Sequence, residues 1–442
     1  MENEGDQAFI PRTTRSKAAG GGLEGGYWSD DEGFELKSFR LCLKLVGVGD
    51  HSNIWRTGFS WSVFLVLAIG VPVLSHFVLS CDTCDASHRR PYDAVVQLSL
   101  SVFAIISFAC LSSWCRKYGL KRFLFLDKLD DESHWIQQRY KQQLRRSMKL
   151  LCVYVLPCFA LESAYRIWWY VTGATQIPYY QNMYVSDTIA CILQLSSWVY
   201  RISIFIIVCI LYQSICYLQI FKLEDFAQVF QRESEVGSIL KEHLRMRRNL
   251  RIISHRFRKF ILLSLIGVSA SQFFSLLVTI RSNANNNLFE FGELAICSIN
   301  LVAGLFICLR SATKITHKAQ SVTSLAAKWH ICATINSYDD MDGETPTSQL
   351  PTTNQVFPAN IDWVLDEEEE DVDDDQDNTK LVPIFAHTIS FQKRQALVTY
   401  LENNRAGMTV FGFMMDRTWL HTIFGIELAL LLWLLNKTIG IC

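Results

Sequence analysis

Long apolar stretches, separated by polar and charged segments, dominate the hydrophobic pattern of this chain. A helix of about 20 mostly apolar residues is long enough to cross the hydrocarbon core of a bilayer. Seven stretches approach or exceed that length, and each predicts one membrane-spanning helix: residues 59–80, 94–114, 150–171, 188–216, 260–280, 292–309 and 410–435. The pattern therefore predicts an all-α, polytopic membrane protein with seven transmembrane helices.

Composition and charge add an orientation to this picture. Half of the 442 residues are hydrophobic, and the net charge of −1 hides a segregation of charge along the chain. Lys and Arg are concentrated in the N-terminal arm and in the loops after the second and fourth spans, whereas the alternate loops carry few. Positively charged loops stay in the cytoplasm. We therefore expect a cytoplasmic N-terminus and an extracellular C-terminus, with the plasma membrane as the default location.

The segments around the spans predict four regions. Residues 1–50 form a Gly-rich, charged arm that we expect to be disordered or to lie at the membrane interface. Residues 51–336 hold the first six spans, and their helical pattern continues into the cytoplasm. Residues 337–379 are rich in Asp, Glu and Pro, which predicts a disordered acidic loop. Residues 380–442 hold a further helix, expected in a cytoplasmic helical anchor domain, and then the last span.

The last span carries a stripe of small and weakly polar residues. On a helix at about 100° per residue, five of them fall on one side: Thr418, His421, Thr422, Gly425 and Ala429. Glu427 falls on the opposite side. Stripes of this kind mediate helix packing in membranes, and in an oligomer the same stripe would line a pore.

Charged residues inside the third and fourth spans mark a second candidate site. Glu162 and Arg166 are four residues apart, as in an intrahelical ion pair, and Arg201 lies at a similar depth in the fourth span. We expect Glu162 and Arg201 to pair with each other or to share a polar pocket with Arg166. Ionisable residues in membrane spans usually face the bundle interior, so a structural salt bridge and a ligand-contacting cluster both remain open.

Aromatic residues accompany these charges, among them Trp169 and Trp198. Rings near the ends of spans commonly form belts at the membrane interface. The alternative is an outward-facing cavity for a small, partly apolar ligand. In that case Trp169 and Trp198 would form a ligand pocket with the three charged residues.

The first extracellular loop contains the sequence Cys81-Asp-Thr-Cys84. A C-x-x-C pair can be redox-active, bind zinc or form a disulfide. No second C-x-x-C and no nearby His pair completes a zinc site. On the oxidising side of the membrane we expect a local disulfide between Cys81 and Cys84, with unpaired cysteines as the alternative. No metal and no cofactor is expected.

Together these features resemble the plant family of gustatory-receptor-like membrane proteins, relatives of insect odorant and gustatory receptors. The resemblance rests on seven spans, an inside N-terminus, long cytoplasmic extensions and a short motif in the last span. In the insect proteins this motif is Thr-Tyr, five hydrophobic residues and Gln-Phe. Here Thr418-Trp419 stands at its start and Gly425-Ile426 at its end, so the Gln-Phe is absent.

The resemblance implies a homotetrameric, ligand-gated cation channel. The last helices would line one central pore, the cytoplasmic extensions would build a shared anchor, and the ligand would bind in the outer half among the second to sixth spans. The gate positions of the family fall on Thr422 and Gly425. A Gln supplies hydrogen-bonding atoms at a gate, whereas a Gly supplies only space, so the resemblance implies a gate of different chemistry.

Other functions compete with a channel. A non-conducting receptor or scaffold would recruit cytoplasmic partners through the anchor and the acidic loop. Transporters often show repeated halves and broken helices, but the sequence shows no repeat and only Pro157 as a break within a span. An enzyme would need a motif such as H-E-x-x-H, G-x-S-x-G or a P-loop, and none is present. The expected partners are the bilayer, further copies of the chain and a small-molecule ligand, without nucleic acid.

Overall fold

The computed structural model describes residues 54–78, 92–118, 134–173, 182–232, 236–281, 288–339 and 391–439. Nearly all of them are helical, and seven helices are long and apolar enough to cross a membrane: Thr57–Val78, Asp93–Lys117, His134–Gly173, Met183–Ala227, Val236–Ile280, Gly292–Ile331 and Arg417–Asn436. The predicted all-α fold with seven spans is therefore confirmed, and the protein is an integral, multi-pass membrane protein. The side on which each terminus lies stays a prediction.

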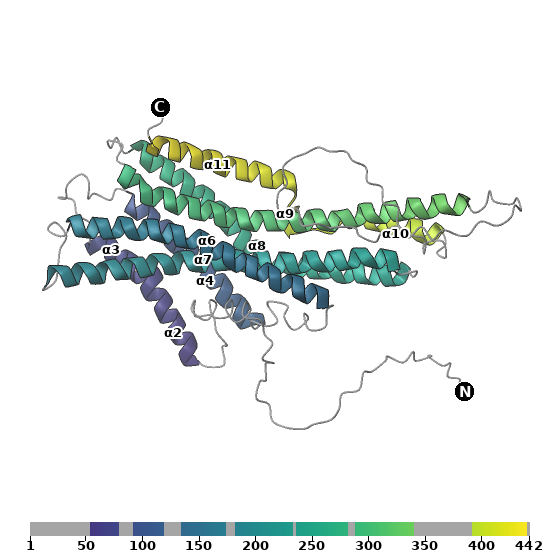
Figure 1. Cartoon of the computed structure of the whole chain (residues 1–442), viewed down its shortest axis with the longest axis horizontal. Helices are drawn as coiled ribbons and strands as arrows, with labels where there is room; N and C mark the ends of the chain where they lie inside the picture. The colour runs from purple at the N-terminus through teal and green to yellow at the C-terminus, as the bar shows by residue number, and fades with distance from the viewer. Residues whose placement is uncertain are drawn as a thin grey trace, which may run out of the picture.

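Figure 1 shows these helices as an elongated bundle. The first span is α2 (Ile54–Leu65), the π-helical segment η1 (Val66–Gly70) and α3 (Val71–Val78); the next five are α4 (Asp93–Tyr118), α6 (His134–Gly173), α7 (Met183–Arg232), α8 (Val236–Arg281) and α9 (Leu288–Asp339). After them come α10 (Phe391–Asn403), the strands β1 (Thr409–Val410) and β2 (Phe413–Met414), and the last span α11 (Arg417–Ile439).

Four helices are much longer than a bilayer requires. Helices α6, α7, α8 and α9 have 40, 50, 46 and 52 residues, whereas about 20 suffice to span. Their ends beyond the apolar spans pack together with α10, mainly on α9, and we call this part of the molecule the extension. The continued helical pattern beyond the fourth, fifth and sixth spans is therefore confirmed.

Polar contacts hold the extension together. The carboxylate of Glu224 on α7 lies 3.0 Å from Arg139 on α6 and 3.4 Å from Lys318 on α9. The Glu224 side chain is buried, and burial removes water from its carboxylate. The two neighbouring cations compensate for that lost hydration. On the far side, Arg247 of α8 donates a hydrogen bond of 2.7 Å to Asn404, just after α10. These contacts fix the ends of helices that belong to different spans.

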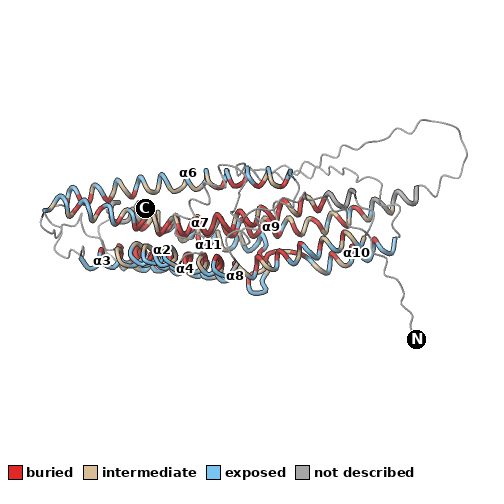
Figure 2. The backbone as a smooth tube through the Cα atoms, turned by 90° about the horizontal axis from the view of Figure 1, so that it is seen from below, coloured by how far each residue is buried: buried red, intermediate tan, exposed pale blue. Residues whose placement is uncertain are grey.

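Helix α7 is the centre of the bundle. Nearly every residue from 202 to 221 is buried, and Figure 2 shows the buried colour following α7 and α9 through the middle of the molecule. Helix α7 packs most extensively against α9 and α6. A methyl group added at Gly304 of α9 would overlap the ring of Phe205 on α7. The absence of a side chain at Gly304 is therefore what allows the two helices to approach this closely.

The first span contains a break that the sequence pattern does not predict. Residues 66–70 form a π-helical segment, in which the wider turn disturbs the regular hydrogen-bond ladder. Ser101 of α4 donates a hydrogen bond of 2.8 Å to the carbonyl of Ala68, and Ser197 of α7 donates one of 2.5 Å to the carbonyl of Leu67. The prediction that Pro157 is the only break within a span is therefore wrong, although Pro157 does lie inside α6.

A β-hairpin replaces the predicted start of the last span. Strands β1 and β2 pair antiparallel, with Val410 opposite Phe413. The two turn residues, Phe411 (φ 50°) and Gly412 (φ 93°), both have positive φ, as a two-residue type I′ turn requires. Helix α11 begins only at Arg417, whose N–H donates a hydrogen bond of 2.7 Å to the Asp416 carboxylate. The predicted boundary of the span at residue 410 is wrong because a hairpin satisfies this backbone.

Candidate functional site

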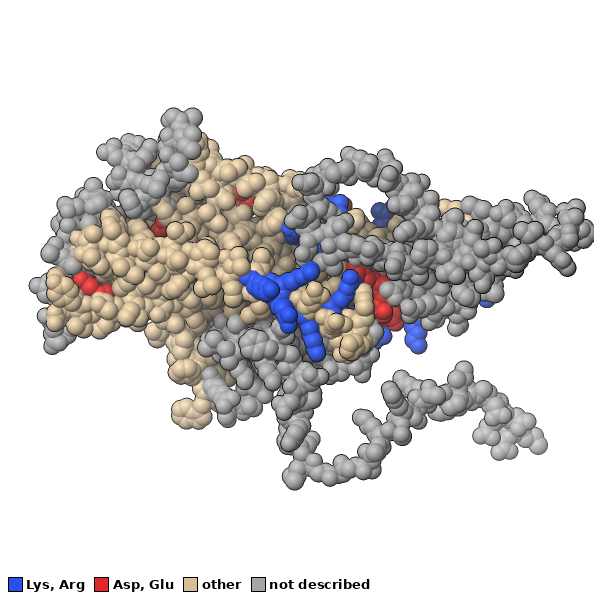
Figure 3. All heavy atoms as spheres, in the orientation of Figure 1, with Lys and Arg blue, Asp and Glu red and all other residues tan. Residues whose placement is uncertain are grey.

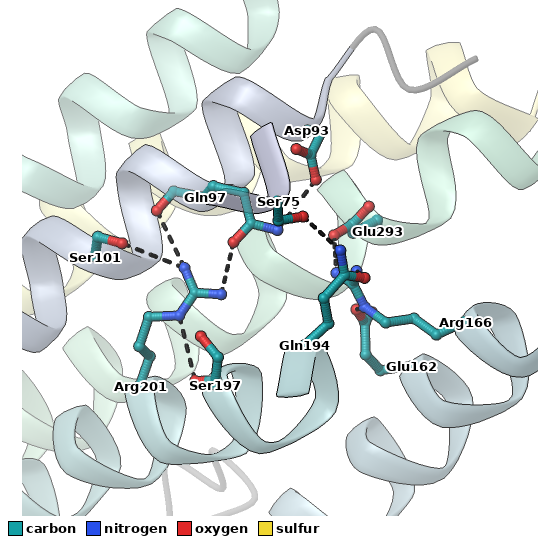
Figure 4. A network of polar contacts seen from close by, with 10 residues as sticks. All are labelled: Ser75, Asp93, Gln97, Ser101, Glu162, Arg166, Gln194, Ser197, Arg201 and Glu293. Carbon is teal, nitrogen blue, oxygen red and sulfur yellow. Dashed lines mark hydrogen bonds and ion pairs between the residues drawn. The ribbon is translucent and has the colours of Figure 1, made fainter. Parts of the chain in front are cut away.

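A buried polar network joins five of the seven spans (Figure 4). It lies in the half of the spans that is farther from the extension. Its members come from α3, α4, α6, α7 and α9, and all are buried except the half-buried Ser101: Ser75, Asp93, Gln97, Ser101, Glu162, Arg166, Gln194, Ser197, Arg201 and Glu293. Polar side chains in such surroundings are costly unless they satisfy one another. Two neighbouring groups do so, one around each arginine.

Arg166 is the centre of the first group. Its Nε donates to Glu162 Oε1 at 2.6 Å, its Nη2 to Glu293 Oε1 at 2.5 Å and its Nη1 to Gln194 Oε1 at 2.5 Å. Gln194 in turn donates to the hydroxyl of Ser75 on α3. The predicted intrahelical pair of Glu162 and Arg166 is therefore present. Glu293 adds a second carboxylate from α9, so one guanidinium connects α6, α7 and α9.

Arg201 is the centre of the second group, and its contacts correct one expectation. Its Nη2 donates to Gln97 Oε1 at 2.6 Å and its Nε to the Ser197 carbonyl at 3.3 Å. Gln97 of α4 then donates to the Asp93 carboxylate at 3.0 Å. Of the two expected arrangements, the direct pair of Glu162 with Arg201 is wrong, because Glu162 is held by Arg166 one turn away on the same helix. The alternative, a polar region shared with Arg166, is what the structure shows (Figure 4). Arg201 instead reaches neutral oxygens on α4 and on its own helix.

The network is also connected to the break in the first span. Ser101 accepts a hydrogen bond of 3.3 Å from Arg201, and the same hydroxyl donates to the Ala68 carbonyl of η1. Ser197 contributes its carbonyl to Arg201 and its hydroxyl to η1. The two serines therefore connect the charge of Arg201 to the irregular segment of the first span. Because π segments inside helices often occur at functional sites, this connection strengthens the case for the network.

Sequence reasoning missed the other seven members of the network, Ser75, Asp93, Gln97, Ser101, Gln194, Ser197 and Glu293. A signal for two of them was present, since Asp93 and Gln97 are four residues apart, as are neighbours on one helix face. Glu293 stands at the edge of an apolar stretch, where a charge is inexpensive if it reaches water. Its burial follows only from the packing of α9 against α6 and α7.

Trp169 and Trp198 are both about 1% exposed. A residue of an interfacial belt would face lipid, so the belt interpretation is wrong for these two rings. The Trp169 ring lies edge-on to Tyr170 with centroids 5.0 Å apart, and the Trp198 ring lies 6.4 Å from that of Phe159. They follow Arg166 and precede Arg201 by three residues, which places them beside the polar network. The role of this cluster in ligand binding stays a prediction.

The stripe on α11 lies on the face that the bundle leaves uncovered. All five of its residues are exposed in the single chain: Thr418, His421, Thr422, Gly425 and Ala429. A Cβ added at Gly425 would meet no atom within 4 Å. The opposite face packs on α8 and α9, where Glu427 is buried and accepts a hydrogen bond from Ser269. The stripe therefore contributes nothing to packing within the described part of the chain, and its role in a pore stays a prediction.

Several predicted features lie outside the residues that the structure describes. They are Cys81 and Cys84, the N-terminal arm of residues 1–50 and residues 340–379 of the acidic loop. The disulfide and the disorder of the two segments stay predictions. The boundaries of the four regions also stay predictions, although α9 and α10 are placed where the sequence expects helices.

Comparison with known proteins places the chain in a family. Residues 34–426 match the family described as "Protein of unknown function (DUF3537)". The chain belongs to this family. Among solved structures, the DUF3537 chain is similar to that of "the insect olfactory receptor OR5 from Machilis hrabei", with 10% sequence identity and a TM-score of 0.48. The similarity covers 91% of this chain and 97% of that chain. No curated protein matches.

Proposed function

We propose that this DUF3537 protein is the subunit of a homotetrameric, ligand-gated cation channel of the plasma membrane, in which α11 lines a central pore. The observation that carries the proposal is the stripe on α11. It combines small and weakly polar residues on a membrane-spanning helix with an exposed position on the single chain. The gustatory-receptor-like resemblance of the sequence supports the same assembly.

The physical argument concerns what a single chain would present to lipid. The Thr422 hydroxyl donates a hydrogen bond of 2.9 Å to the Thr418 carbonyl of its own helix, but an imidazole such as that of His421 finds no partner in hydrocarbon, and unsatisfied polar groups are costly in that environment. Several copies arranged around one axis would turn Thr418, His421 and Thr422 away from lipid and toward a shared, hydrated passage. Closed cyclic symmetry is the usual form of a homo-oligomer. Small residues such as Gly425 would then let helices approach closely or leave the passage open.

The ligand-binding part of the proposal rests on the network beside Trp169 and Trp198. Glu162 Oε2 is buried and has no hydrogen-bond partner within the described ranges. A donor group on a ligand would satisfy this oxygen, and the neighbouring rings would cover its apolar part. Because the network joins five spans, a ligand bound there would bias the arrangement of the whole bundle.

The first experiment asks whether α11 lies at a symmetry axis, and it needs no ligand. Cysteines introduced by Gly425→Cys are expected to form disulfides between subunits under mild oxidation, because residues at an axis approach their own copies. Ile426→Cys is the matched control, since Ile426 is exposed at the same depth but lies off the stripe. Wild-type chains report the background from native cysteines. Cross-linking at residue 426 but not at residue 425 would exclude the proposed orientation.

The second experiment measures conduction. Potassium flux through the purified chain in liposomes is expected to fall at least tenfold in Gly425→Trp and Thr422→Trp, because bulky rings would fill a narrow pore. Ile426→Trp is expected to retain the flux, and size-exclusion chromatography checks that all three variants keep the oligomer. Flux like that of the wild type in both stripe variants would end the pore assignment. A stable wild-type oligomer without flux would support a non-conducting receptor or scaffold instead.

A further inference from the structure

The hairpin of β1 and β2 lies where two spans begin. It directly precedes α11, and it packs against α8. The guanidinium carbon of Arg258 on α8 lies 5.0 Å from the ring centroid of Phe411. The apolar part of α8 starts two residues later, at Phe260. The hairpin therefore lies at one boundary between the membrane and water, on the side of the extension.

The base of the hairpin is fixed by hydrogen bonds to two long helices. The Met408 N–H donates to Thr316 Oγ1 of α9 at 3.0 Å, and the Thr409 N–H donates to Ser254 Oγ of α8 at 3.1 Å. Met408 and Met415 are buried, and their backbones are joined by a hydrogen bond of 2.9 Å. The position of the tip is therefore set by rigid elements.

The tip itself presents aromatic rings. Phe411 is 51% exposed and Phe413 is 67% exposed, and Trp419 at the start of α11 is 48% exposed. The rings of Phe413 and Trp419 have centroids 6.2 Å apart. A bulky residue at positive φ is unusual, because Asn, Asp or Gly normally occupies this turn position. Phe411 therefore has an exposed ring at a turn position whose backbone conformation disfavours a bulky side chain.

A basic face of α8 lies next to this tip. Arg251, His255, Arg258 and Lys259 fall within about 100° of one another on the helix, and all are exposed or half-buried. No Asp or Glu follows Glu242 on α8, so no carboxylate of this helix neutralises the face. On the face seen in Figure 3, Lys and Arg also gather midway along the molecule, between the apolar spans and the extension.

We propose that the hairpin tip and the basic face of α8 form a docking site for the headgroups of anionic phospholipids. Aromatic rings are favoured at the headgroup level of a bilayer. Lys and Arg close to an anionic membrane surface are attracted to it, and a guanidinium binds phosphate oxygens through paired hydrogen bonds. The rings would enter the interface while the cations bind lipid phosphates. This site depends on membrane insertion and not on the proposed channel activity.

The test is a lipid titration of the purified full chain by native mass spectrometry, with phosphatidylserine and phosphatidylcholine as probes. Wild-type protein is expected to bind phosphatidylserine more tightly than phosphatidylcholine. The double variant Arg258→Gln, Lys259→Gln is expected to lose about 25-fold in affinity for phosphatidylserine, or about fivefold per charge. Lys241→Gln, Arg245→Gln is the matched control, because these exposed cations lie farther out on the same helix. Equal loss in both double variants, or loss in neither, would overturn the proposal.

A second pair of variants separates the lipid from other occupants. Phe411→Ser, Phe413→Ser is expected to weaken binding of both lipids, whereas Phe391→Ser on α10 is expected to leave it unchanged. Glycerophosphoserine, which lacks acyl chains, is expected not to displace phosphatidylserine; displacement would assign the site to a soluble phosphate. Dissociation of the oligomer by the hairpin variant with unchanged lipid binding would assign the surface to contacts between copies. Loss of ion flux alone would bear on the channel and not on this site.

Discussion

At the scale of single residues, Arg166 shows why charge is tolerated inside this membrane bundle. Its guanidinium is 1% exposed and binds Glu162, Glu293 and Gln194 from three helices. A buried charge without partners would cost several kcal/mol, so each member of the group depends on the others. The spacing of Glu162 and Arg166 made their pairing predictable. Glu293 is 127 residues from Arg166 along the chain, and no local pattern connects them.

We predict that Arg166→Met destabilises the protein by about 3–5 kcal/mol, because it leaves two buried carboxylates without their cation. The measurement is thermal unfolding in detergent, followed by size-exclusion chromatography. The triple variant Arg166→Met, Glu162→Met, Glu293→Gln is expected to recover much of this loss, because it removes the uncompensated charges. A single variant as stable as the wild type would show that the ion pairs contribute little.

At the scale of elements, the contact of α7 with α9 depends on a residue without a side chain. Phe205 fills the space over Gly304, and the Phe205 ring lies 5.1 Å from that of Phe103 on α4. Small residues of this kind let membrane helices approach one another closely. In the sequence, Gly304 looks like any glycine inside an apolar stretch, and its neighbour across the interface cannot be identified.

We predict that Gly304→Ala destabilises the protein by about 1–3 kcal/mol, because the added methyl group would displace the Phe205 ring. Gly292→Ala is the matched control on the same helix, since a Cβ there meets nothing within 4 Å. The control is expected to be neutral or to stabilise by up to about 1 kcal/mol through helix propensity. Thermal unfolding in detergent measures both. The double variant Gly304→Ala, Phe205→Leu is expected to lose less stability than the sum of the two single variants. No such relief would argue against the steric explanation.

At the scale of the whole molecule, the predicted orientation assigns a side of the membrane to each end of the bundle. The extension lies at one end of the spans, and exposed basic residues gather on that side. Arg116 and Lys117 follow the apolar part of α4, and Arg145 and Lys149 precede the apolar part of α6. Positively charged segments of this kind are retained in the cytoplasm. With the predicted orientation the extension would be cytoplasmic, and the polar network would lie in the outer half of the bilayer.

We predict that an epitope tag at the N-terminus is reached by antibody only after the cells are permeabilised. A tag with a glycosylation sequon, added after the C-terminus on a spacer, is expected to be glycosylated in the secretory pathway. The two tags control for each other, because seven spans place them on opposite sides of the membrane. Antibody access to the N-terminal tag without permeabilisation, together with an unglycosylated C-terminal tag, would reverse the orientation and with it the assignment of the extension to the cytoplasm.

The sequence by itself determined the features that depend on neighbours along the chain. Seven spans, long helical extensions and the pairing of Glu162 with Arg166 follow from local apolarity and from helix periodicity, which act over one or two turns. The tertiary structure alone decided which partners Arg201 finds, that η1 interrupts the first span, and that residues 409–414 form a hairpin. These outcomes depend on groups that lie far apart in the sequence, such as Thr316 and Ser254 at the hairpin base. Their energies arise only when packing brings the helices together.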